Sequence, residues 1–158
     1  MAGLIVMTHV LRIPILLLAT ALLSGGPSYA QAPAAMDQTT ELSKIQDVEF
    51  RLVRFLSDGK EIPIPSTVTI TLAFRKDSQI SGHSAVNNYA GRFTAEPNGD
   101  IAIQLTTSTQ MAGPPESMEL EREYFDALSH VKHIRVKRDQ VILENEATSM
   151  KFAPSRSK

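Results

Sequence analysis

The sequence predicts an α+β fold that is mostly β. In this fold, about seven to eight short strands form a strongly curved antiparallel sheet or partial barrel, and one helix packs against it. Three observations predict it. Apolar and polar residues alternate in short runs between residues 48 and 152. Turn-forming segments such as Asn98-Gly99 separate these runs. Apolar residues at helical spacing occur once and late, over about Ser117 to His130.

Residues 1–30 have the pattern of a secretory signal peptide. Arg12 precedes an apolar run over residues 13–23 that is too short to span a bilayer comfortably. Ser28 and Ala30 place small residues where a signal peptidase needs them. We therefore expect cleavage after Ala30 and a periplasmic or secreted mature chain; the alternative is an uncleaved anchor helix. The chain has no cysteine, so we expect neither a lipoprotein nor a stable membrane anchor after cleavage.

The remaining residues read as one domain with short flanking segments. We expect a flexible linker at residues 31–46, the folded domain at 47–153 and a disordered tail at 154–158. The formal net charge of −1, from 16 Lys and Arg against 17 Asp and Glu, argues against nucleic acid as a partner. The lack of cysteine excludes thiol catalysis and cysteine zinc sites. We expect no cofactor, and a monomer.

Taken in order, the strands begin with the alternating run from Val48 to Leu52. Its apolar face shifts by one residue at Val53, which predicts a bulge or a strand covered on both faces. Residues 67–75 form the clearest strand, with one face in the core and the other in solvent. The prolines at residues 63 and 65 predict an extended loop before it. Further strands are expected at residues 79–82, 89–95, 101–105, 133–137, 141–144 and 149–152.

The predicted helix carries an apolar stripe that would pack against the sheet. Its acidic first half suits the positive N-terminal end of a helix, so those carboxylates need no catalytic explanation. The residues at helical spacing are Leu120, Tyr124, Phe125, Leu128 and Val131.

The stretch from Gly82 to Gly91 lies between two strand-like runs and holds two asparagines and a tyrosine. Glycine permits sharp turns and close backbone approach. Asn87 and Asn88 tolerate left-handed geometry, and Tyr89 offers a ring to bury. We expect a tight strand-to-strand connection that packs into one end of the β domain.

Two segments carry a family resemblance that spans about residues 47–153. The signature stretch resembles the Gly-x-x-Gly-Cys-Asn-x-Tyr-x-Gly motif of the META domain family, to which HslJ-like heat-shock proteins belong. A second segment, followed by an acidic helix, resembles the Thr-x-Met-Ala-Cys segment of the same family. The matching residues are Gly82, Asn87, Tyr89 and Gly91 in the first segment and Thr109 and Met111 in the second.

The chain also departs from the family pattern. Ala85 stands at the family's second glycine, and Val86 and Gly113 stand at its two cysteines. The resemblance implies a similar curved-sheet fold, links to envelope stress and antibiotic tolerance, and a likeness to secretin pilot proteins that hold lipid. We expect Tyr89 and Met111 to be buried, and the two former cysteine positions to be spatial neighbours.

The functional prediction is an exported, non-enzymatic META-type envelope protein that binds a protein partner or an apolar ligand. The signature residues, Asn88 included, would be structural or binding residues rather than catalytic ones. Two other classes of function stay open. One is a small serine hydrolase that uses Ser84 with His83 or His130; the stretch around it nearly matches a nucleophile elbow but lacks the following helix.

The other class is an inhibitor or structural module that docks an acidic partner. Its surface would be the basic run on the predicted strand after the helix, whose usual role is a solvated strand face. His130 and His133 have the spacing of two metal ligands, but a site normally needs three or four, so no metal is expected. The basic residues are Lys132, Arg135, Lys137 and Arg138.

Overall fold

The structure is a computed structural model that describes residues 37–155. The signal peptide predicted at residues 1–30, its cleavage site after Ala30, the first part of the predicted linker and residues 156–158 of the predicted tail lie outside the described residues. Among the residues that are described, no helix is long and apolar enough to cross a bilayer.

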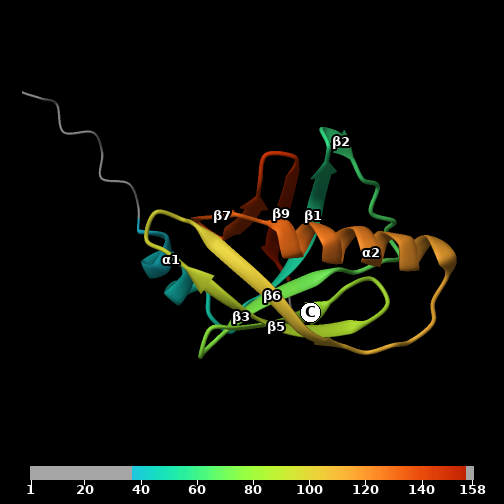
Figure 1. Ribbon diagram of the computed structural model, residues 1–158, viewed down its shortest axis with the longest axis horizontal. Coiled ribbons are helices and arrows are strands. Elements are labelled where there is room, and N and C mark those ends of the chain that lie inside the picture. The colour runs from blue at the N-terminus through green and yellow to red at the C-terminus, as the bar shows by residue number, and fades with distance from the viewer. Residues whose placement is uncertain (1–36, 156–158) are drawn as a thin grey trace, which may run out of the picture. The chain divides into compact units, whose positions relative to one another are not determined.

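The strands form one antiparallel sheet that curls into a half-barrel, with a helix packed against it, as Figure 1 shows. The strand order is β6-β5-β4-β3-β1-β9-β8-β7, and the short β2 pairs with β1 at its edge. This confirms the predicted fold class. The elements are α1 (Gln38–Lys44), β1 (Glu49–Ser57), β2 (Lys60–Glu61), β3 (Thr71–Arg75), β4 (Gln79–His83), β5 (Asn88–Ala95), β6 (Ile101–Ser108), α2 (Pro115–His130), β7 (His133–Lys137), β8 (Gln140–Glu144) and β9 (Thr148–Pro154).

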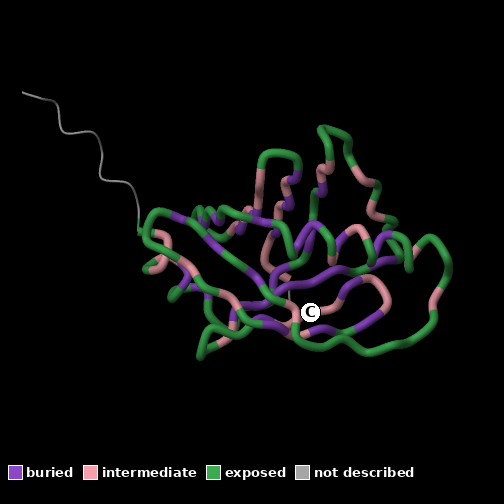
Figure 2. Tube along the Cα trace, in the orientation of Figure 1, coloured by how far each residue is buried: buried purple, intermediate pink, exposed green. Residues whose placement is uncertain are grey.

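The two outer strands, β6 and β7, meet at one end of the half-barrel. Asp100 and His133 form an isolated bridge there, and the backbone N–H of Ile101 donates to the Lys132 carbonyl at 2.8 Å. The helix α2 packs against β6 and fills the concave side of the sheet. Its Tyr124 is completely buried. Figure 2 shows buried residues, in purple, at intervals along the strands and along α2.

The prediction of a flexible linker over residues 31–46 is wrong for its second half, where the helix α1 forms. Asp37 caps this helix, because its carboxylate accepts hydrogen bonds from the backbone N–H groups of Thr39 and Thr40. Leu42 is buried in the core. The Gln38 side chain accepts a hydrogen bond from the N–H of Val136 at 2.7 Å, so α1 also covers the outer edge of β7.

The predicted strand over residues 67–75 is shorter and more covered than expected. Regular pairing begins at Thr71, after an isolated bridge at Ile70. Thr71 and Ala73 are both buried, although alternation placed Thr71 on a solvent face, and the Thr71 hydroxyl accepts a hydrogen bond from the backbone N–H of His83 at 3.1 Å. The bulge predicted at Val53 is confirmed by a register shift between β1 and β9, and Val53 points outward with 51% of its surface exposed. The predicted tail is wrong at its start, since Pro154 pairs within β9.

Candidate functional site

The signature stretch forms the end of β4, a four-residue turn and the start of β5, as the sequence predicts. The backbone N–H of Ser84 donates to the Asn87 carbonyl at 2.8 Å and closes the turn. Ala85 has a φ of +79°, a left-handed conformation that favours glycine. We call residues 84–87 the signature turn.

A carboxylate from α2 fills the signature turn. Glu121 Oε2 accepts hydrogen bonds from Ser84 Oγ at 2.6 Å and from the N–H groups of Asn87 at 2.8 Å and Val86 at 3.3 Å. Its other oxygen, Oε1, accepts from Asn87 Nδ2 at 2.8 Å. Only 7% of Glu121 is exposed. The turn therefore binds an internal anion through backbone and side-chain donors together.

These hydrogen bonds keep the buried carboxylate ionised. Burial raises the pKa of Glu121, but the hydrogen bonds from Ser84, Asn87 and Val86 lower it by more, so the pKa lies below its usual value. Hydrogen bonds to a charged acceptor are shorter and stronger than neutral ones. The carboxylate is therefore a fixed structural charge that holds β4, β5 and α2 together.

Asn87 extends the network to the segment that precedes α2. Its Oδ1 accepts from Thr109 Oγ1 at 2.8 Å and from the backbone N–H of Met111 at 2.7 Å. Asn88 pairs with Thr109 through its backbone: its N–H donates to Thr109 Oγ1 at 3.1 Å, and its carbonyl accepts from the Thr109 N–H at 3.0 Å. The two matched segments of the sequence thus contact each other directly.

Tyr89 and the two motif glycines, Gly82 and Gly91, form a second set of close contacts beside the signature turn. Tyr89 is buried, as predicted, and its hydroxyl donates to the Thr71 carbonyl at 2.9 Å and lies 2.7 Å from the hydroxyl of Tyr124 on α2. Burial raises the pKa of both tyrosines. A Cβ on Gly82 would lie 2.0 Å from the Thr71 oxygen, and a Cβ on Gly91 would lie 2.5 Å from a backbone oxygen of β6. Only glycine fits at either position.

The prediction that Met111 is buried is wrong. Its backbone N–H and C=O bind Asn87, but its side chain is 51% exposed. The prediction about the former cysteine positions is confirmed. A Cβ built on Gly113 lies 3.5 Å from the Cβ of Val86, within the range that a disulfide spans.

The residues of the hydrolase alternative do not converge. Ser84 is completely buried, and its hydroxyl is bonded to Glu121. His83 Nδ1 instead contacts the Asn88 side chain at 3.2 Å, and His130 Nδ1 contacts the backbone of its own helix at Asp126. Within residues 37–155, no group of three or more His, Asp or Glu side chains converges as a metal site would require.

The predicted basic run lies on the exposed face of β7 and its flanking turns. Buried and exposed residues alternate along the strand. Arg135 is bound to Glu144 at 2.8 Å, and the neighbouring His133 Nδ1 lies 2.9 Å from Asp100. The remaining three cations are exposed without a partner in the ion pairs that the structure forms over residues 37–155: Lys132, Lys137 and Arg138.

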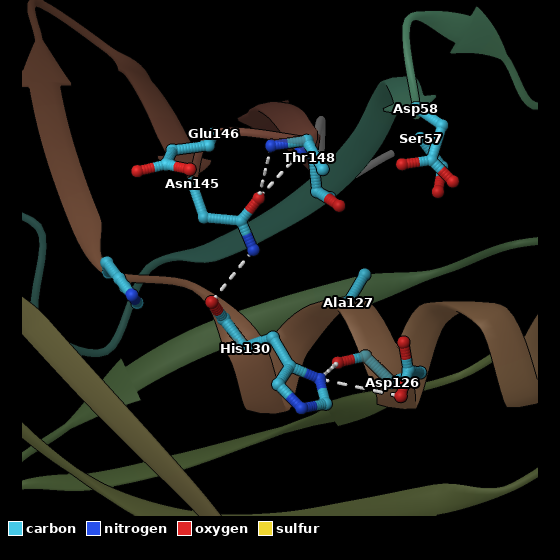
Figure 3. A pocket seen from close by; sticks show the side chains of 10 residues that line it. Ser57, Asp58, Asp126, Ala127, His130, Asn145, Glu146 and Thr148 are labelled. Carbon is cyan, nitrogen blue, oxygen red and sulfur yellow. Dashed lines mark hydrogen bonds and ion pairs between the residues drawn. The ribbon is translucent and has the colours of Figure 1, made fainter.

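Sequence reasoning missed a hollow of about 470 Å³ between the C-terminal half of α2, the end of β1 and the β8–β9 turn, which Figure 3 shows. Asn145 shapes it, because its Oδ1 accepts from the N–H of Thr148 at 2.7 Å and its Nδ2 donates to the His130 carbonyl at 2.8 Å. The side chains of Asp58, Asp126 and Glu146 line it.

Sequence reasoning also missed Glu121, which it took for a solvated helix carboxylate. One signal could have identified it. Glu121, Tyr124 and Leu128 follow the spacing i, i+3, i+7, so a helix that buries Tyr124 and Leu128 also turns Glu121 inward.

Comparisons with known proteins agree with this architecture. Residues 43–157 match the META domain. A protein from Burkholderia xenovorans, solved by NMR, is similar with a TM-score of 0.61 and 22% identity over 82% of this chain and 96% of its own. A duf4847 family protein from Bacteroides vulgatus ATCC 8482 is similar with a TM-score of 0.57 and 14% identity over 73% and 98%. No curated protein matches this chain.

The half-barrel, the signature turn and the bound internal carboxylate thus define a small antiparallel β-domain closed by one helix. This chain belongs to the META domain family. The structural neighbours share its fold at identities too low to carry a function.

Proposed function

We propose that this protein is an exported, non-enzymatic META-domain module that acts by binding a partner protein at its surface. The observation that carries the proposal is the commitment of the signature residues to one another. Ser84 Oγ and both polar groups of the Asn87 side chain are occupied by Glu121 and by the segment before α2. These groups maintain the fold and leave no free nucleophile or base in the turn.

The concave side of the sheet is filled by α2, and this favours a protein partner over an apolar ligand. Leu120, Tyr124 and Leu128 project from α2 into this side and are 6%, 0% and 0% exposed. A carrier of lipid needs an open apolar cavity. Here the helix occupies the place that such a ligand would take. Export is supported by the signal-peptide pattern of residues 1–30.

Native mass spectrometry of the full-length gene product, purified from the envelope of its own cells, tests this proposal. We expect a chain that begins at Gln31, either alone or with a protein bound, and without lipid. A stoichiometric lipid adduct would contradict the protein-binding role, and a chain that retains residues 1–30 in the cytoplasm would contradict export. A Ser84→Ala variant that loses a hydrolytic activity but keeps its fold would restore the hydrolase alternative.

A further inference from the structure

A continuous groove follows α2 along the side that faces the end of β1, the β2–β3 loop and the β8–β9 turn. It consists of three hollows of about 330, 320 and 470 Å³. The first and second share Glu123, and the second and third share Ser57, Asp126, Ala127 and Thr148. We call it the α2 groove; Figure 3 shows its third hollow.

Carboxylates line the α2 groove along its whole length. Four of them follow the spacing i, i+3, i+7, i+10 along α2, so they lie on one face of the helix and span about 15 Å. Asp58 and Glu146 add two more from the opposite wall. The four helical residues are Glu116, Glu119, Glu123 and Asp126.

This negative charge is poorly neutralised within the protein. Glu119 contacts Arg122 at 3.2 Å, and Asp126 contacts His130 at 3.4 Å, a pair that is ionic only when the histidine is protonated. Among the ion pairs of residues 37–155, none involves Glu116, Glu123, Asp58 or Glu146. The six carboxylates face two permanent cations in the groove, Arg122 and Lys132, whereas the whole chain has a formal charge of only −1.

The groove also has an apolar floor. This floor is the surface of Ile62, Pro63 and Pro65 in the first hollow, opposite the helix. Leu120 and Ala127 also line the groove, but they are already buried in the core. A simple cation would satisfy the rim but leave this floor exposed. A purely apolar segment would bury the floor but leave the carboxylates unpaired, which is costly. The surface therefore suits a chain that is cationic along one side and apolar along the other.

We propose that the α2 groove binds a peptide segment of the partner protein that carries Lys or Arg along one side and apolar residues along the other. This inference rests on the proposed function, because it assigns the surface and the chemistry of that partner. The partner of the α2 groove is therefore cationic, whereas the basic run on β7 would select an acidic partner.

Fluorescence anisotropy with a labelled amphipathic lysine–leucine peptide tests the proposal on the mature chain, residues 31–158. Wild type should bind the peptide, and the variant Glu116→Gln/Glu123→Gln should bind it about five- to tenfold more weakly, since each exposed charge pair contributes modestly. The matched control is Glu49→Gln/Glu96→Gln, which removes two exposed carboxylates outside the groove and should bind within about twofold of wild type.

A second peptide separates groove binding from bulk charge attraction. A lysine–serine peptide keeps the charge but cannot cover the apolar floor, so it should bind at least about tenfold more weakly. Equal loss in the groove and control variants, equal affinity for both peptides, or no binding to wild type would each overturn the proposal. None of these outcomes bears on the envelope mass spectrum. A lipid adduct in that spectrum would overturn the proposed function whatever the peptides do.

Discussion

Ser84 Oγ donates a 2.6 Å hydrogen bond to Glu121 Oε2 across 37 positions of the sequence, and both residues are buried. The bond joins the turn between β4 and β5 to the middle of α2. The hydroxyl of Ser84, the nucleophile of the hydrolase alternative, thus has a structural role. The same bond fixes the orientation of α2 over the sheet.

Replacing Glu121 with glutamine should destabilise the fold by about 2–3 kcal/mol, because the site offers only donors and a glutamine amide adds two more. Urea denaturation measures the change in the free energy of unfolding. Glu119→Gln, two residues away on the exposed face of α2, is the matched control and should change stability by less than about 0.5 kcal/mol. Equal effects in the two variants would show that the Glu121 network contributes nothing specific.

The same carboxylate should make stability depend on pH in the acid range. The pKa of Glu121 is lower in the folded state than its ordinary value of 4.5, so the unfolded chain binds more protons just below that pH. The contribution is therefore fully present above 4.5 and is lost as pH falls through the folded pKa. Urea midpoints measured from neutral to acid pH should fall more steeply in wild type than in Glu121→Gln. Parallel curves would contradict this assignment.

Much of the fold could be predicted from local patterns. Alternation located most of the strands, helical spacing located α2, and the shift at Val53 located a bulge that the structure contains. The errors arise where long-range contacts decide. The helix α1 depends on contacts such as that of Gln38 with β7, 98 positions away, which no local pattern reveals. Thr71 is buried on a face that alternation assigned to solvent, and its hydroxyl binds the backbone N–H of His83, 12 positions away.

The candidate site was harder to predict for a related reason. A motif residue can act through its backbone, as Met111 does, and its side chain is then free to face solvent. A charged residue can be buried when donors surround it, as Glu121 is, although charge alone suggests exposure. The α2 groove combines segments that are far apart in the chain, so only the folded structure shows that its carboxylates share one surface.

Gly82→Ala should cost more than about 3 kcal/mol, because the new Cβ would collide with backbone rather than with a flexible side chain. It would lie 2.0 Å from the Thr71 oxygen and 2.7 Å from the Tyr89 hydroxyl that binds that oxygen. Gly59→Ala is the comparison: the added Cβ meets no other atom, but the φ of +73° strains an alanine backbone. This variant should lower the free energy of unfolding by only about 1 kcal/mol. A smaller loss at Gly82 than at Gly59 would contradict the proposed close packing. Thermal denaturation of both variants provides the comparison.

Ala85→Gly should stabilise the protein by about 0.5–1 kcal/mol. Ala85 has a φ of +79°, and glycine relieves that strain at the expense of some entropy in the unfolded chain. Ala102→Gly, at an exposed position inside β6, has the entropic cost without the relief and should destabilise by about 0.5–1 kcal/mol. The two changes in urea midpoint should therefore have opposite signs; equal signs would refute the strain argument.

Val86→Cys/Gly113→Cys should form a disulfide. The Cβ positions lie 3.5 Å apart, and the bond would tie the signature turn to the segment before α2. Closing this loop should raise the free energy of unfolding by about 3–4 kcal/mol through the lost entropy of the unfolded chain. Urea midpoints under oxidising and reducing conditions measure the gain, and thiol titration after oxidation measures whether the bond has formed.

Gly113→Ala is the control that separates cross-linking from packing. Its Cβ would lie 2.8 Å from Val86 Cγ2, and the stiff valine side chain leaves it little room, so this variant alone should lose about 1 kcal/mol. The double cysteine variant removes the obstructing methyl groups together with the valine, so it should show no such loss even when reduced. If free thiols persist after oxidation, the two segments are farther apart than 3.5 Å implies. The valine–glycine pair would then not be a packed replacement for a cross-link.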